Sequence, residues 1–188
     1  VSEVTERAMQ GELDFKESLI QRVGTLAGAD EAILAKVKSE LPFMPEVREL
    51  IATMQQYGWK AAIASGGFTY FSDYLKEELS LVHAQSNQLE IVEGKLTGKV
   101  LGDIVSAETK AEILVELADK YDIEISNTVA VGDGANDLVM MEAAGLGIAY
   151  HAKPKVQQKA QAAVRHADLG GVACILSASL LLNKKLSW

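Results

Sequence analysis

The chain has 188 residues, 48% of them apolar, and a formal net charge of −8 at pH 7, which suits one domain or one domain with a small accessory module. The negative charge argues against a nucleic-acid partner and against binding an acidic membrane, and no apolar run approaches the roughly 18–20 residues of a membrane span. The opening VSEVTE does not have the pattern expected of a signal peptide. A single cysteine, Cys174, excludes an internal disulfide; this fits a cytoplasmic location, and the apolar stretch around Cys174 predicts a core position.

The first 40 residues have the pattern of helices. Apolar side chains such as Phe15 and Leu19 recur at helical spacing among charged neighbours. Gly28 is a plausible helix stop, and Asp30 is a plausible cap for a helix that runs to Ser39.

Two prolines at 42 and 45 then break the pattern, and strands alternate with helices beyond them. The expected elements are a helix over 46–56, a strand over 60–64, a helix over 68–78, a strand over 81–85, a hairpin over 89–100, a helix from Ser106 to about 121, a strand over 128–132, a helix over 135–144, a strand over 146–149, and helices near 154–160 and 172–182. This alternation predicts an α/β fold, a doubly wound and mostly parallel sheet over 42–188, with a small helical module over 1–41.

The most informative motif is TVAVGDGAND, from Thr128 to Asp137. Its continuous apolar run predicts a strand buried on both faces, and two glycines bracket Asp133 at the end of that strand. Open α/β sheets bind ligands at the carboxyl ends of their parallel strands. Asp133 and Asp137 offer hard oxygen ligands of the kind that Mg²⁺ takes, so the motif predicts a magnesium site.

Three other interpretations of this motif compete. A dinucleotide-binding G-x-G-x-x-G pattern fails because Asp137 stands in place of the third glycine. An EF-hand loop fails because the oxygen ligands have the wrong spacing. The third interpretation makes Asn136 and Asp137 ordinary first-turn residues that complement a helix dipole, but it leaves Asp133 unexplained.

Two further groups could bind phosphate. Ser65, Gly66 and Gly67 follow a predicted strand, where backbone N–H groups and a hydroxyl could cradle an anion; the alternative is a serine cap with a glycine turn. Lys110 lies near the start of a helix, where a cation opposes the helix dipole. A bound anion would explain that position, and the alternative is a solvated surface lysine.

Arg22 lies near the apolar stripe of the first helices, where it could grip a carboxylate with two hydrogen bonds. The more ordinary alternative is an arginine that extends to solvent. Three histidines, at 83, 151 and 166, are scattered singly, so they predict neither a zinc site nor a catalytic triad.

Taken together, Ser-Gly-Gly after one strand, a helix-borne lysine and Gly-Asp-Gly-Ala-Asn-Asp after another strand resemble the haloacid-dehalogenase superfamily of phosphatases. The wider match, from Met9 through Arg22, resembles the members that act on O-phospho-L-serine, and it extends over essentially the whole chain. The resemblance implies catalytic roles for Ser65, Lys110 and Asp137, metal binding by Asp133, and substrate binding by Arg22, Met9, Phe15, Ser65, Gly66, Gly67, Lys110 and Asn136.

The same resemblance implies a Mg²⁺-dependent, cytoplasmic phosphatase that releases L-serine through an aspartyl-phosphate, as the last step of serine biosynthesis. Its partner would be the small phosphoserine molecule, and the protein could form a homo-oligomer. Alternatives are a phosphatase or phosphotransferase for another small phosphate ester, and a non-catalytic fragment that binds a ligand or partner.

The chain departs from the family pattern because D-x-D-x-T, the nucleophile motif, occurs nowhere in it. We therefore expect the nucleophile, the acid/base aspartate and the first core strand upstream of Val1, so that 1–41 is a partial cap. The strands at 60–64 and 128–132 would each keep an unpaired edge, and an unpaired buried backbone group costs about 1–3 kcal/mol. The 188 residues alone are expected to be inactive and unstable as a monomer.

Overall fold

The computed structural model describes residues 15–185, with side chains described through Ser177. The chain divides into two compact units, each assembled from two stretches of sequence. Unit 1 contains 62–109 and the N-terminal part up to Pro42, and unit 2 contains 43–61 and 110–188. The expected division into a cap (1–41) and a core (42–188) stays a prediction.

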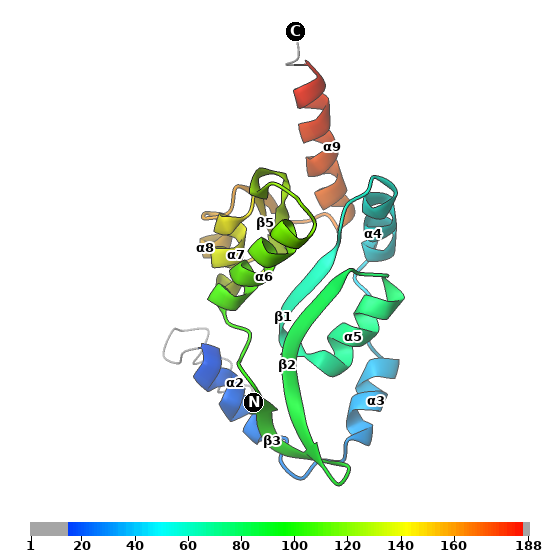
Figure 1. The fold of residues 1–188 in the computed structure, drawn as a ribbon, viewed down its shortest axis with the longest axis vertical. Helices are drawn as coiled ribbons and strands as arrows, with labels where there is room; N and C mark the ends of the chain where they lie inside the picture. The colour runs from blue at the N-terminus through cyan, green and yellow to red at the C-terminus, as the bar shows by residue number, and fades with distance from the viewer. Residues whose placement is uncertain (1–14, 186–188) are drawn as a thin grey trace. The chain divides into compact units, whose positions relative to one another are not determined.

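Unit 1 contains a three-stranded sheet with the order β1-β2-β3 (Figure 1). Strand β1 (Ala62–Phe68) is parallel to β2 (His83–Val92), and β2 is antiparallel to β3 (Lys95–Leu101). The helices of this unit are α2 (Phe15–Gly24), α3 (Ala32–Ser39) and α5 (Thr69–Glu78). The β2–β3 connection confirms the predicted hairpin: Glu93 and Gly94 both have positive φ, as a tight hairpin turn requires.

The core of unit 1 lies between α2 and the hairpin, and Figure 1 shows α2 beside β3. Leu19 and Val23 of α2 are buried with Leu89 and Leu96 of the hairpin. Gly98 permits this close approach, because a Cβ there would lie 2.9 Å from the Cβ of Ala27. The apolar spacing of the first helices therefore marks the face that packs on the sheet.

Unit 2 contains an all-parallel sheet with the order β4-β5-β6. Its strands are β4 (Val129–Gly132), β5 (Leu146–Tyr150) and β6 (Ala162–Val164). Its helices are α4 (Val47–Gln56), α7 (Leu138–Ala143), α8 (Pro154–Gln157) and α9 (Gly170–Lys185), with short 3-10 turns η1 (Ile125–Asn127) and η2 (Ala135–Asp137). The boundary that separates unit 1 from unit 2 falls within helix α6 (Ala107–Lys120), after Thr109 and before Lys110.

Strand β5 is buried on both faces. The strand for which such burial was predicted, β4, is buried on one face only: Ala130 is 3% exposed, whereas Val131, on the opposite face, is 38% exposed. In β5, Ile148 and Ala149 are each 0% exposed. Ala149 packs with Met141 of α7 in one cluster, whereas Ile148 packs with Val172 and Leu176 of α9 in another. Because successive strand residues point to opposite faces, helices cover both sides of β5, and the doubly wound α/β fold is confirmed.

Several details differ from the predictions. The predicted strand over 81–85 and the first strand of the predicted hairpin form one continuous strand, β2. Helix α8 ends at Gln157, and a strand, β6, follows it. This strand has three residues, too few to show an alternating pattern in the sequence, and it forms because Ala162 pairs with Ile148 of β5. Helix α2 ends at Gly24, four residues before the expected stop. Cys174 is exposed rather than in the core, because α9 turns other residues toward the sheet.

Each three-stranded sheet has two edge strands among the described residues, β1 and β3 in unit 1 and β4 and β6 in unit 2. In unit 1, β1 pairs with β2 alone, and in unit 2, β4 pairs with β5 alone. No helix in the described part of the chain has the length and apolar character needed to cross a bilayer.

Candidate functional site

The loop that follows β4 is wrapped around one carboxylate, that of Asp137. Asp137 is 6% exposed, and its Oδ2 accepts the backbone N–H groups of Asp133 at 3.1 Å and of Gly134 at 3.0 Å. A Cβ on Gly132 would collide with the side chain of Asp137, and one on Gly134 would collide with that of Asn136. Gly132 is therefore needed for the loop to close around this acid, whereas a Cβ on Gly134 would require the end of the Asn136 side chain to move.

Lys110 is held by the other oxygen of the same carboxylate. Its Nζ donates to Oδ1 of Asp137 at 2.6 Å, and the two side chains are 6% and 8% exposed. The surface-lysine alternative is thus wrong, because Asp137 compensates the buried cation near the start of α6. An ammonium group has three donors, so two remain available after the bond to Asp137.

Asp133 is the acid of this loop whose side chain stays exposed. No hydrogen bond or ion pair within the described part of the chain engages its carboxylate. Residues 15–185 bring no three His, Cys, Asp or Glu side chains together as a metal site. Mg²⁺ is commonly bound by one or two carboxylates together with waters and substrate phosphates, so a single free carboxylate at the end of β4 fits this ion.

In unit 1, the Ser65–Gly67 segment was predicted to follow a strand, but it lies inside β1, at a bulge that we call the Ser65–Gly67 turn. The register between β1 and β2 shifts between Ala64 and Phe68, which releases the backbone between them from the regular ladder. Oγ of Ser65 accepts the N–H of Gly67 at 3.0 Å. This bond leaves the hydroxyl proton of Ser65 free to be donated.

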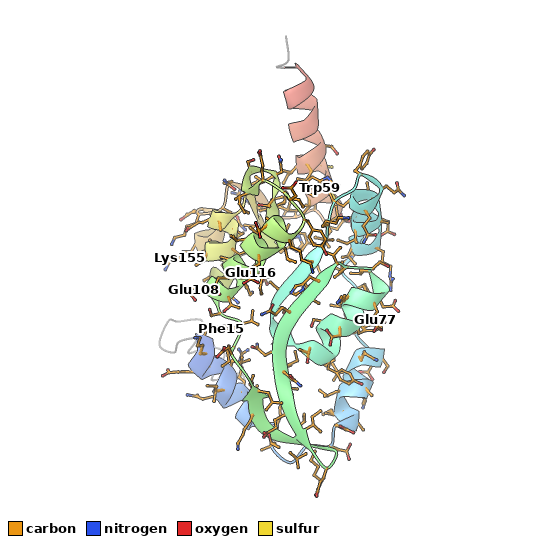
Figure 2. The ribbon with its side chains drawn as sticks, in the orientation of Figure 1. Phe15, Trp59, Glu77, Glu108, Glu116 and Lys155 are labelled. Atoms are coloured by element: carbon orange, nitrogen blue, oxygen red, sulfur yellow. The ribbon has the colours of Figure 1, made fainter. Side chains whose placement is uncertain are left out.

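Two predicted substrate residues lie in the same unit as this turn. Phe15, labelled in Figure 2, contacts Gly66, where a Cβ would lie 2.5 Å from its ring. Arg22 is half-buried, and its Nε donates to the Ser18 carbonyl of its own helix at 3.2 Å. Met9 lies outside the described residues.

The structure adds one buried polar residue, Asn87, that the sequence patterns do not mark. Its amide donates to the carbonyl of Gly66 at 2.9 Å and accepts the N–H of Val105 at 2.8 Å. The predicted strand over 81–85 stops before this residue. The available signal was the polar run from Gln85 to Gln88, which is unusual inside a strand.

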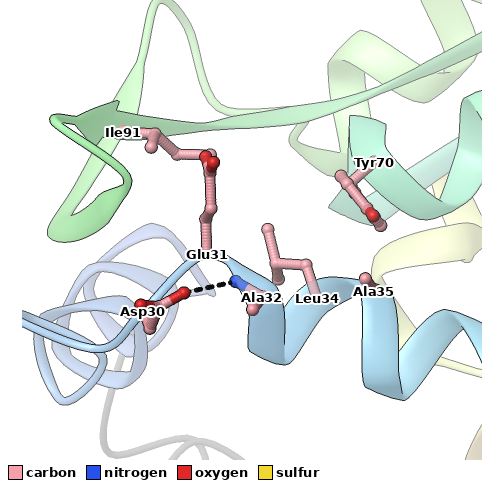
Figure 3. Close-up of a pocket in the computed structure, with 7 residues that line it drawn as sticks. All are labelled: Asp30, Glu31, Ala32, Leu34, Ala35, Tyr70 and Ile91. Carbon is pink, nitrogen blue, oxygen red and sulfur yellow. Dashed lines mark hydrogen bonds between the residues drawn. The ribbon is translucent and has the colours of Figure 1, made fainter.

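Unit 1 also holds a pocket of about 360 Å³ (Figure 3). It lies at the start of α3 and is lined by Asp30, Glu31, Ala32, Leu34, Ala35, Tyr70 and Ile91. Asp30 accepts the N–H of Ala32 at 2.8 Å, as expected for the predicted cap. None of the predicted site residues lines this pocket.

Comparison with known proteins gives consistent results. A family model of haloacid dehalogenase-like hydrolases matches residues 6–142. A phosphoserine phosphatase of Vibrio cholerae is 71% identical over 188 residues, which are 100% of this chain and 57% of that protein. The chain thus spans little more than half the length of this relative.

Two solved structures of phosphoserine phosphatase are also similar, one with substrate bound and one with an analogue of a phospho-aspartyl intermediate. Each is 36% identical, has a TM-score of 0.87, and matches 93% of this chain and 83% of its own. The matched range of the family model contains the Ser65–Gly67 turn, Lys110 and the whole loop from Gly132 to Asp137. The chain belongs to the family of haloacid dehalogenase-like hydrolases.

Proposed function

We propose that the protein with this chain is a Mg²⁺-dependent phosphatase that hydrolyses O-phospho-L-serine to L-serine and phosphate. The observation that carries the proposal is the buried Lys110–Asp137 pair, fixed by the loop that presents the free carboxylate of Asp133. The similarity to phosphoserine phosphatases supports the choice of substrate. The reaction would be the last step of serine biosynthesis, in the cytoplasm, and a homo-oligomer stays a prediction.

Each residue of the loop after β4 would have a separate task. Lys110 would donate to a phosphoryl oxygen, and Asp137 would hold its ammonium group in place, so that little reorganisation is needed during the reaction. Asp133 would hold Mg²⁺, which when bound supplies positive charge to the phosphoryl oxygens. Asn136, which folds over Gly134, would support the phosphate site.

The Ser65–Gly67 turn would donate hydrogen bonds to the phosphoryl group. The hydroxyl proton of Ser65 is free because its oxygen accepts the N–H of Gly67. The glycines let the backbone approach the ligand closely. Phe15 and Met9 would contact the serine part of the substrate, and Arg22 would bind its carboxylate.

We further propose that the phosphoryl group transfers first to an aspartate: its carboxylate oxygen bonds to phosphorus as the bond to the serine oxygen breaks, and an acid/base aspartate gives its proton to the departing serine oxygen. Water then cleaves this aspartyl-phosphate and releases phosphate. No D-x-D-x-T pattern occurs in the 188 residues, so the nucleophile is not assigned to them. The Vibrio cholerae relative matches the whole chain, so it gives no support to the prediction that these residues alone are inactive. An assay of the 188-residue polypeptide beside the full-length protein would test that prediction.

The substrate assignment is tested through Arg22 in the full-length protein. Arg22→Ala should cost about 2–4 kcal/mol in kcat/KM for phosphoserine, because a charged partner of the carboxylate is lost. The loss should be small for phosphoethanolamine, which has no carboxylate. Gln21→Ala, at an exposed position of the same helix, is the control and should change neither rate. Equal losses on both substrates would contradict a carboxylate-binding role.

A further inference from the structure

We propose that Asn87 is a positioning residue that sets the direction in which Ser65 presents its hydroxyl proton. This inference deepens the proposed function, on which it rests. Asn87 is 1% exposed and lies in β2, next to the bulge of β1. Both ends of its amide are used: Nδ2 donates to Gly66 and Oδ1 accepts from Val105.

The first step of the argument is the geometry of one peptide plane. The carbonyl of Gly66 and the N–H of Gly67 belong to the same trans peptide group and point in opposite directions. Asn87 holds the carbonyl at 2.9 Å, and Oγ of Ser65 holds the N–H at 3.0 Å. This plane cannot turn without breaking one of the two bonds. Because Gly66 and Gly67 are both glycines, their own backbone preferences would not fix the orientation of this peptide plane.

The second step concerns the hydroxyl of Ser65. A serine oxygen can accept hydrogen bonds and has one proton to donate. When the N–H of Gly67 occupies a lone pair, the proton points to another side and can reach an anion there. Asn87 therefore acts on Ser65 through the Gly66–Gly67 peptide, without any contact to a substrate.

The third step explains why the residue is an asparagine. Oδ1 of Asn87 accepts the N–H of Val105, which directly precedes Ser106. Ser106 in turn caps α6, since its Oγ accepts the N–H of Thr109 at 3.2 Å. One neutral amide can donate on one side and accept on the other, whereas an ionised aspartate only accepts and a leucine does neither.

Asn87→Asp is the test substitution in the full-length protein. The carboxylate can still accept from Val105, but it places an oxygen against the carbonyl of Gly66. We expect kcat/KM for phosphoserine to fall about 10–100-fold, as when one donor to the reacting group is misplaced. Gln88→Glu makes the same chemical change at the exposed neighbouring position and should stay within about twofold of wild type.

A double-mutant cycle with Ser65→Ala separates positioning from a general structural role. If Asn87 acts through the hydroxyl, Asn87→Asp should cost less than about threefold once that hydroxyl is absent. Losses that multiply in the double variant would overturn the proposal, and so would wild-type kcat/KM in Asn87→Asp. Should Asn87→Asp fail to fold, Asn87→Ser, whose short side chain cannot span both partners, takes its place in the same cycle.

A second readout does not depend on catalysis. Amide hydrogen exchange at Gly67 should speed up in Asn87→Asp and remain unchanged in Gln88→Glu, because only the first change frees the peptide plane. An unchanged exchange rate in Asn87→Asp would refute the positioning role even in an active enzyme. Conversely, a wild-type protein that does not hydrolyse phosphoserine would refute the proposed function, while the exchange rates still decide the role of Asn87.

Discussion

Asp137 uses both carboxylate oxygens within its own unit, one for Lys110 and one for two backbone N–H groups. The carboxylate therefore stabilises the loop and the cation together. A buried pair of this kind contributes little net stability, because the cost of desolvation offsets the attraction, but removal of one partner leaves an uncompensated buried charge.

Asp137→Ala should lower the free energy of unfolding by about 3–5 kcal/mol, because Lys110 is left buried and charged. Adding Lys110→Met should recover part of this loss, since no charge then remains in the site. Urea unfolding measures both effects. Asp119→Ala, at an exposed position of α6, is the control and should stay within about 0.5 kcal/mol of wild type. A double variant less stable than Asp137→Ala would contradict this explanation.

Asp133 differs from its neighbour because its carboxylate is exposed and unengaged within the described residues. Asp133→Asn should lower phosphatase kcat/KM by roughly 10²–10³-fold, as loss of a ligand to the charge-neutralising ion would. Calorimetric titration with Mg²⁺ should show weaker binding at an unchanged unfolding temperature. Asp103→Asn, another exposed acid, provides the comparison, and full activity in Asp133→Asn would rule out its role as a ligand.

At the level of elements, the contact of α7 with β5 depends on a residue without a side chain. A Cβ on Gly147 of β5 would lie 2.6 Å from the carbonyl oxygen of Met141 and 2.7 Å from its Cβ. Helix α7 carries Met141, which is 2% exposed and packs in the core beside Ala149. The helix therefore lies as close to the strand as a glycine permits.

Gly147→Ala should destabilise the protein by about 1–3 kcal/mol, because α7 must move to admit the methyl group. Gly24→Ala adds the same group at the end of α2, where no atom lies within 4 Å of the new Cβ. That variant should be neutral or more stable by up to about 1 kcal/mol. Chemical denaturation of both variants gives the comparison, and equal stabilities would show that α7 adjusts freely.

At the level of the whole molecule, unit 2 is discontinuous in sequence, and an acid pair joins its two parts. Glu46 precedes α4 with a positive φ of 63°, and its carboxyl lies against Gly170, the first residue of α9. A hydrogen bond with Asp168 and repulsion from the same carboxylate raise the pKa of Glu46 above its ordinary value. The N–H of Gly170 lowers this pKa in part, and the charge of Glu49 adds to the rise.

This raised pKa makes stability depend on pH. The folded state binds the proton of Glu46 more tightly than the unfolded state does, so the free energy of unfolding falls as pH rises through the raised pKa. Glu46→Gln removes one negative charge and keeps a donor for Asp168. We expect a higher unfolding temperature than wild type at pH 7 and no gain below about pH 4, where the wild-type carboxyl is protonated.

Thermal unfolding between pH 4 and pH 8 checks this difference. Glu116→Gln, at an exposed position on α6 that Figure 2 labels, controls for the change in net charge. A gain in Glu116→Gln as large as that in Glu46→Gln would assign the effect to overall charge rather than to the pair with Asp168.

Much of the architecture follows from local chemistry and could be predicted. The existence of strand β5, the turn at Glu93 and Gly94, and the cap at Ser106 each depend on neighbouring residues and on standard backbone geometry. For these features, the sequence pattern and the structure agree. The Gly132–Asp137 loop is local too, since its hydrogen bonds join residues three or four positions apart, but there the pattern offered Asp137 as a Mg²⁺ ligand, whereas its two oxygens accept from Lys110 and from two backbone N–H groups.

By itself, the sequence determined the α/β class and the glycine-rich segments of β1 and of the loop after β4, because periodicity, glycine placement and capping are local properties. Only the tertiary structure decided the state of Lys110, whose partner is 27 positions away. It also decided the hydrogen bonds of Asn87, whose partners are 21 and 18 positions away, and the existence of β6, which depends on pairing with β5. The physical reason is the same in each case: the stabilising partner is brought close by folding, and no pattern along the chain encodes that distance.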